Sequence, residues 1–355
     1  MTGTPFLERI GVAHPVIQAP MGGGPSTPEL VAAVSNAGGL GSLAGAYLSP
    51  SQIVDAVRRV RSLTDGPFSV NLFAGGDERE RQVDPRPMLD LLAEVHDALG
   101  LPVPSLPALP PNPFREQFEA VLEVRPPVFS FTFGIPDPDA LARLRERSIT
   151  IFGTATTVQE ARMLAGAGVD AIVAQGEEAG AHRGTFAGPF EAAMVPTLDL
   201  VRAIRGAVPV PVIASGGIME GRGIAAAVAA GASAAQLGTA FLTCPESGAS
   251  EAYKQALLSA RTDTTVVTRA FSGRPARALA NTFIARVHGR DDAILPFPLQ
   301  NALTRAMRAA AAQQGNAEFL SLWAGRGVTR VRAMPAGDLV RRLVDEMQSG
   351  EARPH

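Results

Sequence analysis

The chain has 355 residues, of which 46% are hydrophobic and 19% are charged, so it can bury a large core and is not intrinsically disordered. Its 34 acidic and 32 basic residues give a net charge of −2, and we therefore expect neither a nucleic acid nor an anionic membrane as a partner. The single cysteine, Cys244, excludes an internal disulfide, a cysteine-ligated iron–sulfur cluster and a zinc site of several thiolates. No apolar stretch reaches the roughly 18 residues of a membrane span and no targeting segment is recognisable, so we expect a soluble, cytoplasmic protein that binds small molecules.

A repeated unit runs through the chain: an alanine-rich helical stretch, then glycine, then a short apolar run. It is clearest at residues 30–43, 158–175 and 224–237. The glycine stands where the end of a helix needs a left-handed residue, and the apolar run is too short and too β-branched to be a second helix. Each unit is therefore predicted to be a helix followed by a strand.

Short and nearly continuous apolar runs predict eight strands. In chain order they are Val16–Ala19, Leu40–Leu43, Phe68–Leu72, Val128–Thr132, Thr150–Gly153, Ala171–Gln175, Val212–Ser215 and Ala234–Leu237. Helical patterns separate most of them, as in a parallel sheet covered by helices, and about 250 residues is the usual size of a closed (β/α)8 TIM barrel. A doubly wound open sheet is the alternative, but the first strand lacks the G-x-G-x-x-G turn of a dinucleotide-binding sheet.

Two stretches interrupt the alternation of helix and strand. Residues 101–113 are rich in proline and are predicted to form an extended connection over the surface. The second stretch begins after Cys244, where patterns predict helices at Ser250–Ala260, Ala276–Val287 and Leu299–Ala312 and a short strand at Val266–Arg269. A last helix is predicted at Ala336–Met347.

These patterns predict three ranges in an α/β protein. Residues 1–245 form the barrel, residues 246–328 form a small, mostly helical domain beside the barrel mouth, and residues 329–355 return to the barrel.

Glycine-rich loops follow the seventh and eighth predicted strands, as Ser215-Gly216-Gly217 and Gly238-Thr239. Active sites of such barrels lie at the C-terminal ends of the strands, and these two loops are the recurrent phosphate-binding place. Glycine there lets backbone N–H groups approach an anion closely. The alternative is that the glycines only form tight turns; both loops together favour a bound phosphate.

Other strand ends carry side chains that suit a flat ring. Met21 and Gly22 follow the first strand, Asn71 ends the third, and Gln175 ends the sixth, where its amide can bond the edge of a heterocycle. A phosphate at one side and a flat ring at the other indicate a mononucleotide cofactor.

His182 is the one histidine of the chain just beyond the functional end of a predicted strand. Its position in a glycine-rich loop favours a catalytic role over a structural one. Metal binding is not expected, because no second histidine or carboxylate stands at a useful spacing except the pair Glu177 and Glu178. Cys244 is interpreted as a packing residue.

In this order the motifs resemble the nitronate monooxygenase family, formerly called 2-nitropropane dioxygenases. The resemblance rests on Ala19-Pro20-Met21, Asn71, the segment Ser130–Pro136, the loop Gln175–Gly184, Ala214–Ile218 and Gln236–Phe241, together with Thr265–Arg269 and Leu322–Gly327. It implies an FMN-dependent barrel without metal that oxidises alkyl nitronates with O2 to a carbonyl compound and nitrite.

The resemblance also implies roles for single residues. His182 matches the family's active-site histidine. Flavin contacts are expected from Met21, Gly22, Asn71, Gln175, Gly180, Ser215, Gly216, Gly217, Gln236, Gly238 and Thr239, and substrate contacts from Ser130, Gly134, Phe297 and Asn301.

The chain departs from the family pattern at three places. The usual Gly-Gly-His reads Gly180-Ala181-His182, phenylalanine and asparagine at 297 and 301 stand where tyrosines are usual, and Arg326 replaces a common glutamine.

Other functions share the architecture. FMN-dependent enoyl-ACP reductases and NADH:quinone reductases remain alternatives, and a non-catalytic flavin- or phosphate-binding protein is a further one, although the retained His182 argues against it. A dehydrogenase of the inosine-monophosphate type would need a cysteine in the loop 176–184, which has none. The sequence leaves a homodimer open.

Overall fold

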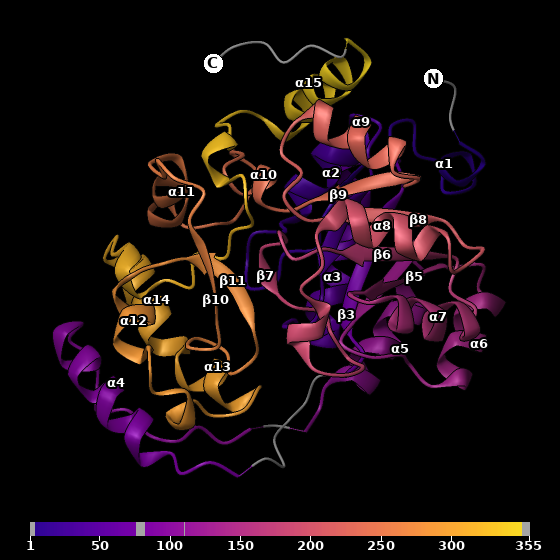
Figure 1. Ribbon diagram of the computed structural model, residues 1–355. Helices are drawn as coiled ribbons and strands as arrows, with labels where there is room; N and C mark the ends of the chain where they lie inside the picture. The colour runs from indigo at the N-terminus through magenta and orange to yellow at the C-terminus, as the bar shows by residue number, and fades with distance from the viewer. Residues whose placement is uncertain (1–3, 76–81, 110, 350–355) are drawn as a thin grey trace.

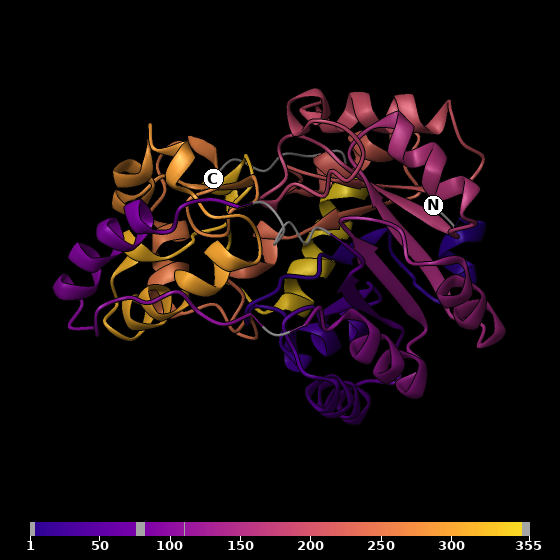
Figure 2. The ribbon, with the colours of Figure 1, turned by 90° about the horizontal axis from the view of Figure 1, so that it is seen from below.

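Two units make up the computed structural model, which describes residues 4–75, 82–109 and 111–349. One is a barrel of parallel strands, and the other is a smaller unit at its side (Figures 1 and 2). Pro110 of the predicted proline-rich connection and the end of the predicted range 329–355 lie outside the described residues. Within the described residues, no helix combines the length and the apolar character needed to cross a membrane.

Eight parallel strands form the barrel: β1 (Val16–Gln18), β2 (Gly41–Ala44), β3 (Phe68–Phe73), β4 (Val128–Thr132), β5 (Thr150–Ala155), β6 (Ala171–Gln175), β8 (Val212–Ser215) and β9 (Ala234–Leu237). Their spatial order is β1-β9-β8-β6-β5-β4-β3-β2. The two ends of this order meet where Ile17 bridges Leu40, whose N–H donates to the carbonyl of Val16 at 3.0 Å. All eight predicted strands and the predicted (β/α)8 barrel are confirmed.

The N-terminal end of the barrel is closed by apolar side chains. Helix α1 (Pro5–Arg9) places Phe6 and Leu7 in one cluster with Val128 and Ala234, which lie at the first residues of their strands. This closure leaves the C-terminal ends of the strands as the open side, where barrels of this kind bind their ligands.

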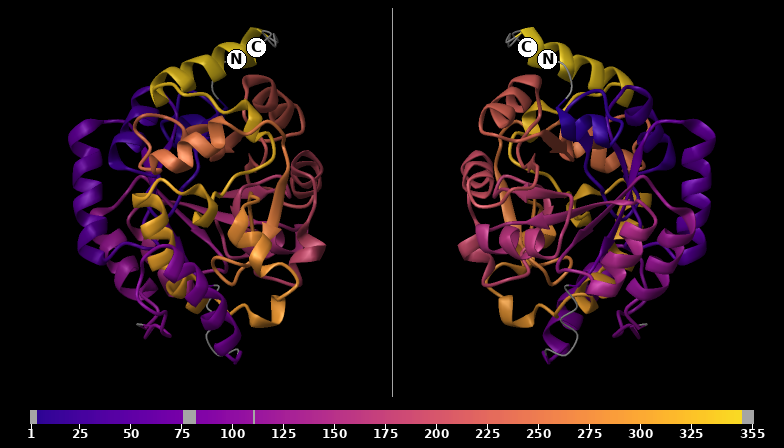
Figure 3. Two further views of the ribbon diagram at one scale, coloured as in Figure 1. Left: turned by 90° about the vertical axis from the view of Figure 1, so that its left-hand side faces the viewer. Right: turned by 90° about the vertical axis from the view of Figure 1, so that its right-hand side faces the viewer.

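Helices cover the outside of the barrel. Several begin with a side chain that caps the helix: Thr27, Ser49 and Asp137 each accept a hydrogen bond from a backbone N–H in the first turn, and a proline follows each of them. The last helix lies against two earlier helices, as contacts and Figure 3 show. The helices of the barrel unit are α2 (Pro28–Asn36), α3 (Pro50–Leu63), α5 (Phe114–Val124), α6 (Pro138–Glu146), α7 (Val158–Gly166), η1 (Phe190–Ala193), α8 (Thr197–Arg205), α9 (Gly221–Ala229), α10 (Thr239–Leu242) and α15 (Ala336–Ser349), of which α10 lies at the C-terminal ends of the strands and α15 packs on α9 and α2.

The second unit combines helices with a small antiparallel sheet. The sheet contains β10 (Thr265–Thr268), β11 (Ala276–Leu279) and the two-residue strand β7 (Ala181–His182), with β11 in the middle. The helical elements are α11 (Glu251–Leu258), α12 (Thr282–Val287), η2 (Asp291–Ala293), α13 (Leu299–Leu303), α14 (Arg305–Gln313), η3 (Ala317–Phe319) and η4 (Val328–Arg330).

The predicted helix at Ala276–Val287 is wrong in its first part. Residues 276–279 form β11, which pairs on both sides, and the helix begins only after Asn281, whose side chain caps it by accepting from the N–H of Ile284 at 3.2 Å. Alanine-rich sequence favours a helix, but pairing with two neighbouring strands outweighs this local preference.

A helix from the early part of the chain also packs on the second unit. Helix α4 (Arg86–Ala98) places Met88, Leu92 and Val95 in one buried cluster with Phe271 and other residues of the second unit. Figure 1 shows α4 beside this unit and away from the strands of the barrel. Part of the predicted barrel range 1–245 therefore belongs to the second unit.

Candidate active site

A pocket of about 510 Å³ opens at the C-terminal ends of the barrel strands, between the barrel and the second unit. Barrel strands contribute residues from their C-terminal halves, such as Asn71 of β3 and Gln175 at the end of β6, and the second unit contributes Asn301 and Trp323. The pocket therefore lies at the open, C-terminal end of the barrel, opposite the end that apolar side chains close.

The structure brings most of the predicted site residues together. His182 lines this pocket, and so do all residues predicted to contact the cofactor and two of those predicted to contact the substrate. The lining includes Met21, Gly22, Asn71, Gln175, Gly180, Ser215, Gly216, Gly217, Gln236, Gly238 and Thr239, together with Ser130 and Asn301.

Gly134 and Phe297 do not line the pocket. Gly134 packs against the loop after β3, where an added Cβ would lie 3.3 Å from the carbonyl oxygen of Ala74. Phe297 is buried, with its ring centroid 6.1 Å from that of His182. Phe297 therefore supports His182 without facing the open part of the pocket.

His182 stands at the junction of the two units. It lies on β7, in the loop after β6, and pairs with Ala276 of β11, so this barrel loop supplies a strand to the sheet of the second unit. Gln175 braces the same loop: its Nε2 donates to the carbonyl of His182 at 3.0 Å, and its Oε1 accepts from the N–H of Gly184 at 2.7 Å. The position of His182 is therefore fixed from both units.

One nitrogen of the His182 imidazole has a hydrogen-bond partner in the protein. Its Nε2 lies 2.8 Å from the Oγ of Ser272. The hydroxyl of Ser272 donates to the carbonyl of Arg274 at 3.1 Å and accepts from the N–H of Arg274 at 3.3 Å. A hydroxyl has a single proton to donate, so Nε2 carries the imidazole proton and Nδ1 keeps a lone pair. No hydrogen bond within the described residues engages Nδ1.

Burial keeps His182 neutral. It lowers the pKa of His182 from 6.5 to about 3, and the positive charges of Arg274 and Arg308 act in the same direction. Aromatic rings cause much of this burial, because Trp323 and Phe133 lie with their centroids 5.4 and 6.0 Å from the imidazole. At physiological pH the side chain is therefore an uncharged group that can accept a proton.

The loop after β8 has the shape of an anion cradle. Gly216 and Gly217 have φ angles of 136° and 67°, which glycine adopts far more readily than other residues. An added Cβ would lie 2.5 Å from Thr197 Oγ1 at Gly216 and 2.9 Å from Glu178 Cβ at Gly217. The N–H groups of both glycines make no hydrogen bond within the described part of the chain. Two adjacent unpaired N–H groups fit a phosphate.

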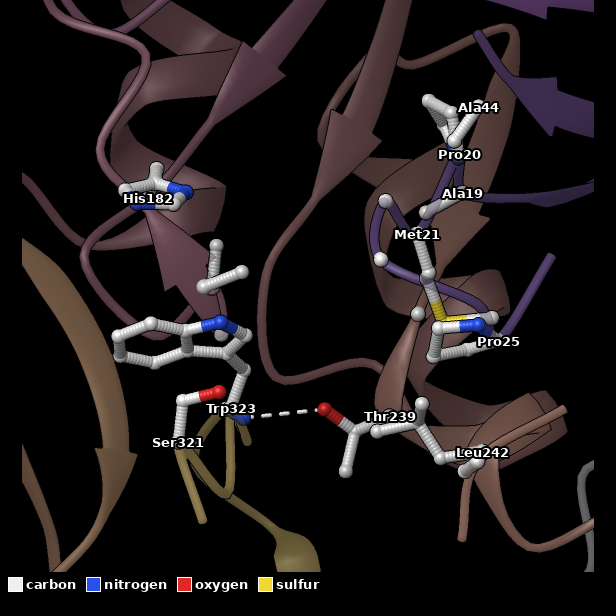
Figure 4. Close-up of a pocket in the computed structure, with 18 of the residues that line it drawn as sticks. Ala19, Pro20, Met21, Pro25, Ala44, His182, Thr239, Leu242, Ser321 and Trp323 are labelled. Atoms are coloured by element: carbon white, nitrogen blue, oxygen red, sulfur yellow. Dashed lines mark hydrogen bonds between the residues drawn. The ribbon is translucent and has the colours of Figure 1, made fainter. Parts of the chain in front are cut away.

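The walls of the pocket differ in character. Figure 4 shows Met21, Pro25 and Leu242 on one side and His182 with Trp323 on the other. The dashed line in that view is the hydrogen bond from the N–H of Gly325 to the Oγ1 of Thr239, at 3.0 Å, which ties the segment 322–327 to the end of β9. An apolar wall opposite a proton acceptor, with an anion cradle beside both, suits a flat phosphorylated ring system.

Sequence reasoning did not single out several residues of this site. Arg305 and Arg308 of α14 line the pocket. Their sequence spacing could have indicated this, because residues three apart lie on one face of a helix, and this helix was predicted beside the barrel mouth. Ser272 carries no local signal, since only the fold brings it to His182. Within the described ranges, no three histidine, cysteine, aspartate or glutamate side chains lie together as a metal site.

A family model described as nitronate monooxygenase matches residues 4–346. The chain belongs to the nitronate monooxygenase family. It is 40% identical over 339 residues to a probable nitronate monooxygenase of Staphylococcus saprophyticus, covering 95% of each chain. A probable nitronate monooxygenase of Staphylococcus aureus strain JH9 is 39% identical over 343 residues, covering 96% of each chain.

Two solved structures are similar to this chain. A nitroalkane oxidase from Streptomyces ansochromogenes is similar with a TM-score of 0.90 and 40% identity, covering 97% of this chain and 98% of that one. FabK from Thermotoga maritima is similar with a TM-score of 0.77 and 28% identity, covering 99% and 97%. Membership of the nitronate monooxygenase family makes this chain a flavin-dependent oxidoreductase that oxidises nitronates with O2, as the resemblance predicted.

Proposed function

We propose that this enzyme binds FMN and oxidises alkyl nitronates with O2 to a carbonyl compound and nitrite. The overall reaction balances when two nitronates and one O2 give two carbonyl compounds and two nitrite ions. FMN supplies the electron transfer when it is bound. The observation that carries the proposal is the neutral imidazole of His182, which shares one pocket with the unpaired N–H groups of Gly216 and Gly217.

The residues of the pocket fit FMN. Gly216 and Gly217, with Gly238 and Thr239 at the neighbouring strand end, would hold the phosphate. Met21 would lie against the flat ring, while Asn71, Gln175, Ser215 and Gln236 would offer polar groups to its edge, and Gly22 and Gly180 would allow close approach. A single anion cradle favours FMN over a dinucleotide flavin.

His182 would act as the base of the site. Its Nδ1 holds a lone pair, because Ser272 fixes the proton on Nε2, and its low pKa keeps it free of a second proton. Such a group can remove the α-proton of a neutral nitroalkane and so produce the nitronate. A protonated imidazole that stabilises the nitronate charge is the other possible role, and the depressed pKa favours the base. Ser130 and Asn301 are proposed as substrate contacts, because they line the same pocket.

The reaction is tested on the purified protein without NADH. We expect one FMN per chain in the extract, and propyl-2-nitronate in air should yield nitrite while O2 is consumed at half that molar amount. A flavin identified as FAD would contradict the cofactor. Turnover that requires NADH would instead favour a reductase, the alternative that the sequence leaves open.

The role of His182 is tested by His182→Asn, which keeps a hydrogen-bonding side chain but cannot take the α-proton. We expect a loss of about 10²- to 10⁴-fold with a neutral nitroalkane and a smaller loss with a pre-formed nitronate, at unchanged FMN content. Equal losses on both substrates would reject proton abstraction in favour of charge stabilisation. Unchanged rates on both would leave His182 with a structural role only.

A further inference from the structure

The walls of the pocket carry positive charge without negative charge. Arg305, Arg308 and Arg326 line it, and no aspartate or glutamate is among the described residues that do so. The chain as a whole has a net charge of −2, so this excess is a property of the pocket and not of the molecule. A recessed site with charge of one sign attracts ligands of the opposite sign.

The three arginines stand in two different settings. Arg326 belongs to the segment 322–327, and its Nη1 pairs with Oε1 of Glu177 at 2.7 Å. Arg305 and Arg308 come from α14 of the second unit, and no carboxylate of the described residues pairs with either of them. Arg305 is exposed, so solvent screens its charge, whereas Arg308 is half-buried. Among the described residues that line the pocket, Arg308 is therefore the half-buried cation that no carboxylate pairs with.

Arg308 is held in place without being neutralised. Its Nη2 donates to the backbone carbonyl of Asn301 at 2.7 Å and to the side-chain Oδ1 of Asn301 at 2.9 Å. Its Nε atom is buried and has no partner among the described residues. Burial lowers the pKa of Arg308 only to about 10, so the guanidinium stays charged at neutral pH. A partly desolvated charge with an unused donor is costly unless an anion completes the site.

The groups near Arg308 do not supply that anion. Burial raises the pKa of Tyr47 to about 12, which keeps the phenol neutral. His182 is also neutral, and the charge of Arg308 contributes to this, which places the two groups within electrostatic reach of each other. Because a neutral imidazole cannot balance the charge of an anionic substrate, another group of the pocket has to do so.

We propose that the guanidinium of Arg308, fixed by Asn301, binds the anionic nitro oxygens of the nitronate. The inference rests on the proposed function, which makes a nitronate the substrate. A nitronate presents two oxygens in one plane, and the planar guanidinium matches such a pair of acceptors. His182 and Arg308 then divide the work: the imidazole deals with the α-proton, and the guanidinium holds the negative charge.

The kinetic test compares a charged substrate with a neutral one. In Arg308→Gln we expect the KM for propyl-2-nitronate to rise about 10- to 100-fold, because charge-assisted hydrogen bonds are lost, while the KM for 2-nitropropane changes little. Arg308→Lys restores the charge without the planar fork and should recover part of the loss. Arg290→Gln removes one exposed positive charge from the same unit and should leave both KM values unchanged. Equal changes in KM for both substrates in Arg308→Gln would overturn the proposal.

Binding gives a second readout that needs no turnover. Isobutyrate has the shape and charge of propyl-2-nitronate, and isobutyramide is its neutral counterpart. Calorimetric titration should show that isobutyrate binds the wild-type holoenzyme at least about 10-fold more tightly than Arg308→Gln, with no such difference for isobutyramide. Asn301→Ala, which releases Arg308 from its support, should weaken isobutyrate binding in the same direction, and it serves if Arg308→Gln fails to fold.

The two proposals fail in different ways. If the wild type oxidises nitronates but Arg308→Gln keeps its KM and its affinity for isobutyrate, the role of Arg308 is refuted and the function stands. If the wild type does not oxidise nitronates but isobutyrate binding still depends on Arg308, the anion site stands and its assignment to a nitronate is refuted with the function.

Discussion

The Nε2 atom of His182 lies 2.8 Å from the Oγ of Ser272, although the two residues are 90 positions apart in the chain. Ser272 lies in the turn between β10 and β11, and His182 lies on β7, which pairs with β11. One small sheet therefore carries both the proposed base and the hydroxyl that holds its Nε2 atom. Ser272 acts on the chemistry only through His182, so it is a positioning residue.

Removal of the Ser272 hydroxyl should slow the removal of a proton by His182. In Ser272→Ala, Nε2 loses its fixed partner, and we expect a fall in kcat of about 5- to 10-fold for a neutral nitroalkane, the worth of one hydrogen bond. Turnover of a pre-formed nitronate should fall less, because no α-proton has to be removed. Steady-state kinetics on the two substrates measures the difference; an equal fall on both would indicate general disorder of the site instead.

A side chain at Gly217 should expel the cofactor. Gly217→Val adds bulk beside Glu178 and displaces an anion from the backbone N–H groups, each of which contributes about 1.5–3 kcal/mol to binding a charged ligand. We expect the dissociation constant for FMN, measured by flavin fluorescence, to rise at least about 10-fold. Gly188→Val is the matched control, because Gly188 has a φ of 92° and nothing within 4 Å of an added Cβ. Full FMN content in Gly217→Val would show that the glycine serves only the turn.

The backbone of Ala181, the residue before His182, is strained. Its φ of 62° lies in the left-handed region, which costs a residue with a Cβ roughly 1–2 kcal/mol. A glycine would avoid this cost, but it would lose part of the gain because it makes the unfolded chain more flexible. We expect Ala181→Gly to raise the free energy of unfolding by about 0.5–1 kcal/mol in urea titrations. Ala256→Gly, in the helix α11, should lower it by about 1 kcal/mol. A loss of stability in both variants would contradict the strain at Ala181.

Stability should depend on pH through His182. The folded pKa is about 3 and the ordinary value is 6.5, so between these values the unfolded chain binds a proton that the folded chain does not. Stability from this group is complete above pH 6.5 and is lost as the pH falls toward 3, by up to about 1.4 kcal/mol per pH unit. Urea unfolding at pH 7, 6 and 5 should show this slope in the wild type and a shallower one in His182→Asn. Parallel slopes in the two proteins would mean that His182 is not buried in its neutral form.

The barrel was predictable because its signal is local. Each strand is a short apolar run bounded by glycine and a helical pattern, and a run such as Val212–Ser215 is buried along its whole length. The strand β11 was missed, because the alanine-rich sequence Ala276–Leu279 becomes a strand only through its two partners. The local sequence preference for helix or strand is informative where an element is buried on both faces. It misleads where pairing with neighbouring strands decides the secondary structure.

The site was predictable to the extent that it lies at strand ends. Gln175 ends β6 and Gly217 lies two residues after β8, so the fold alone brings them together. The contacts of Ser272 and Arg308 depend on how the second unit docks, and no spacing in the sequence encodes that docking. Phe297 is an intermediate case: the family resemblance implied a substrate contact, and its ring lies close to His182 but outside the pocket lining. The domain boundaries, a homodimer and a cytoplasmic location stay predictions.

The pairing of β7 with β11 limits how the enzyme can move. Rotation of the second unit away from the barrel would break the pairing of His182 with Ala276, so the backbone of His182 would lose one of its two supports. We therefore expect substrate exchange to proceed by rearrangement of side chains at the rim of the pocket, and not by separation of the two units.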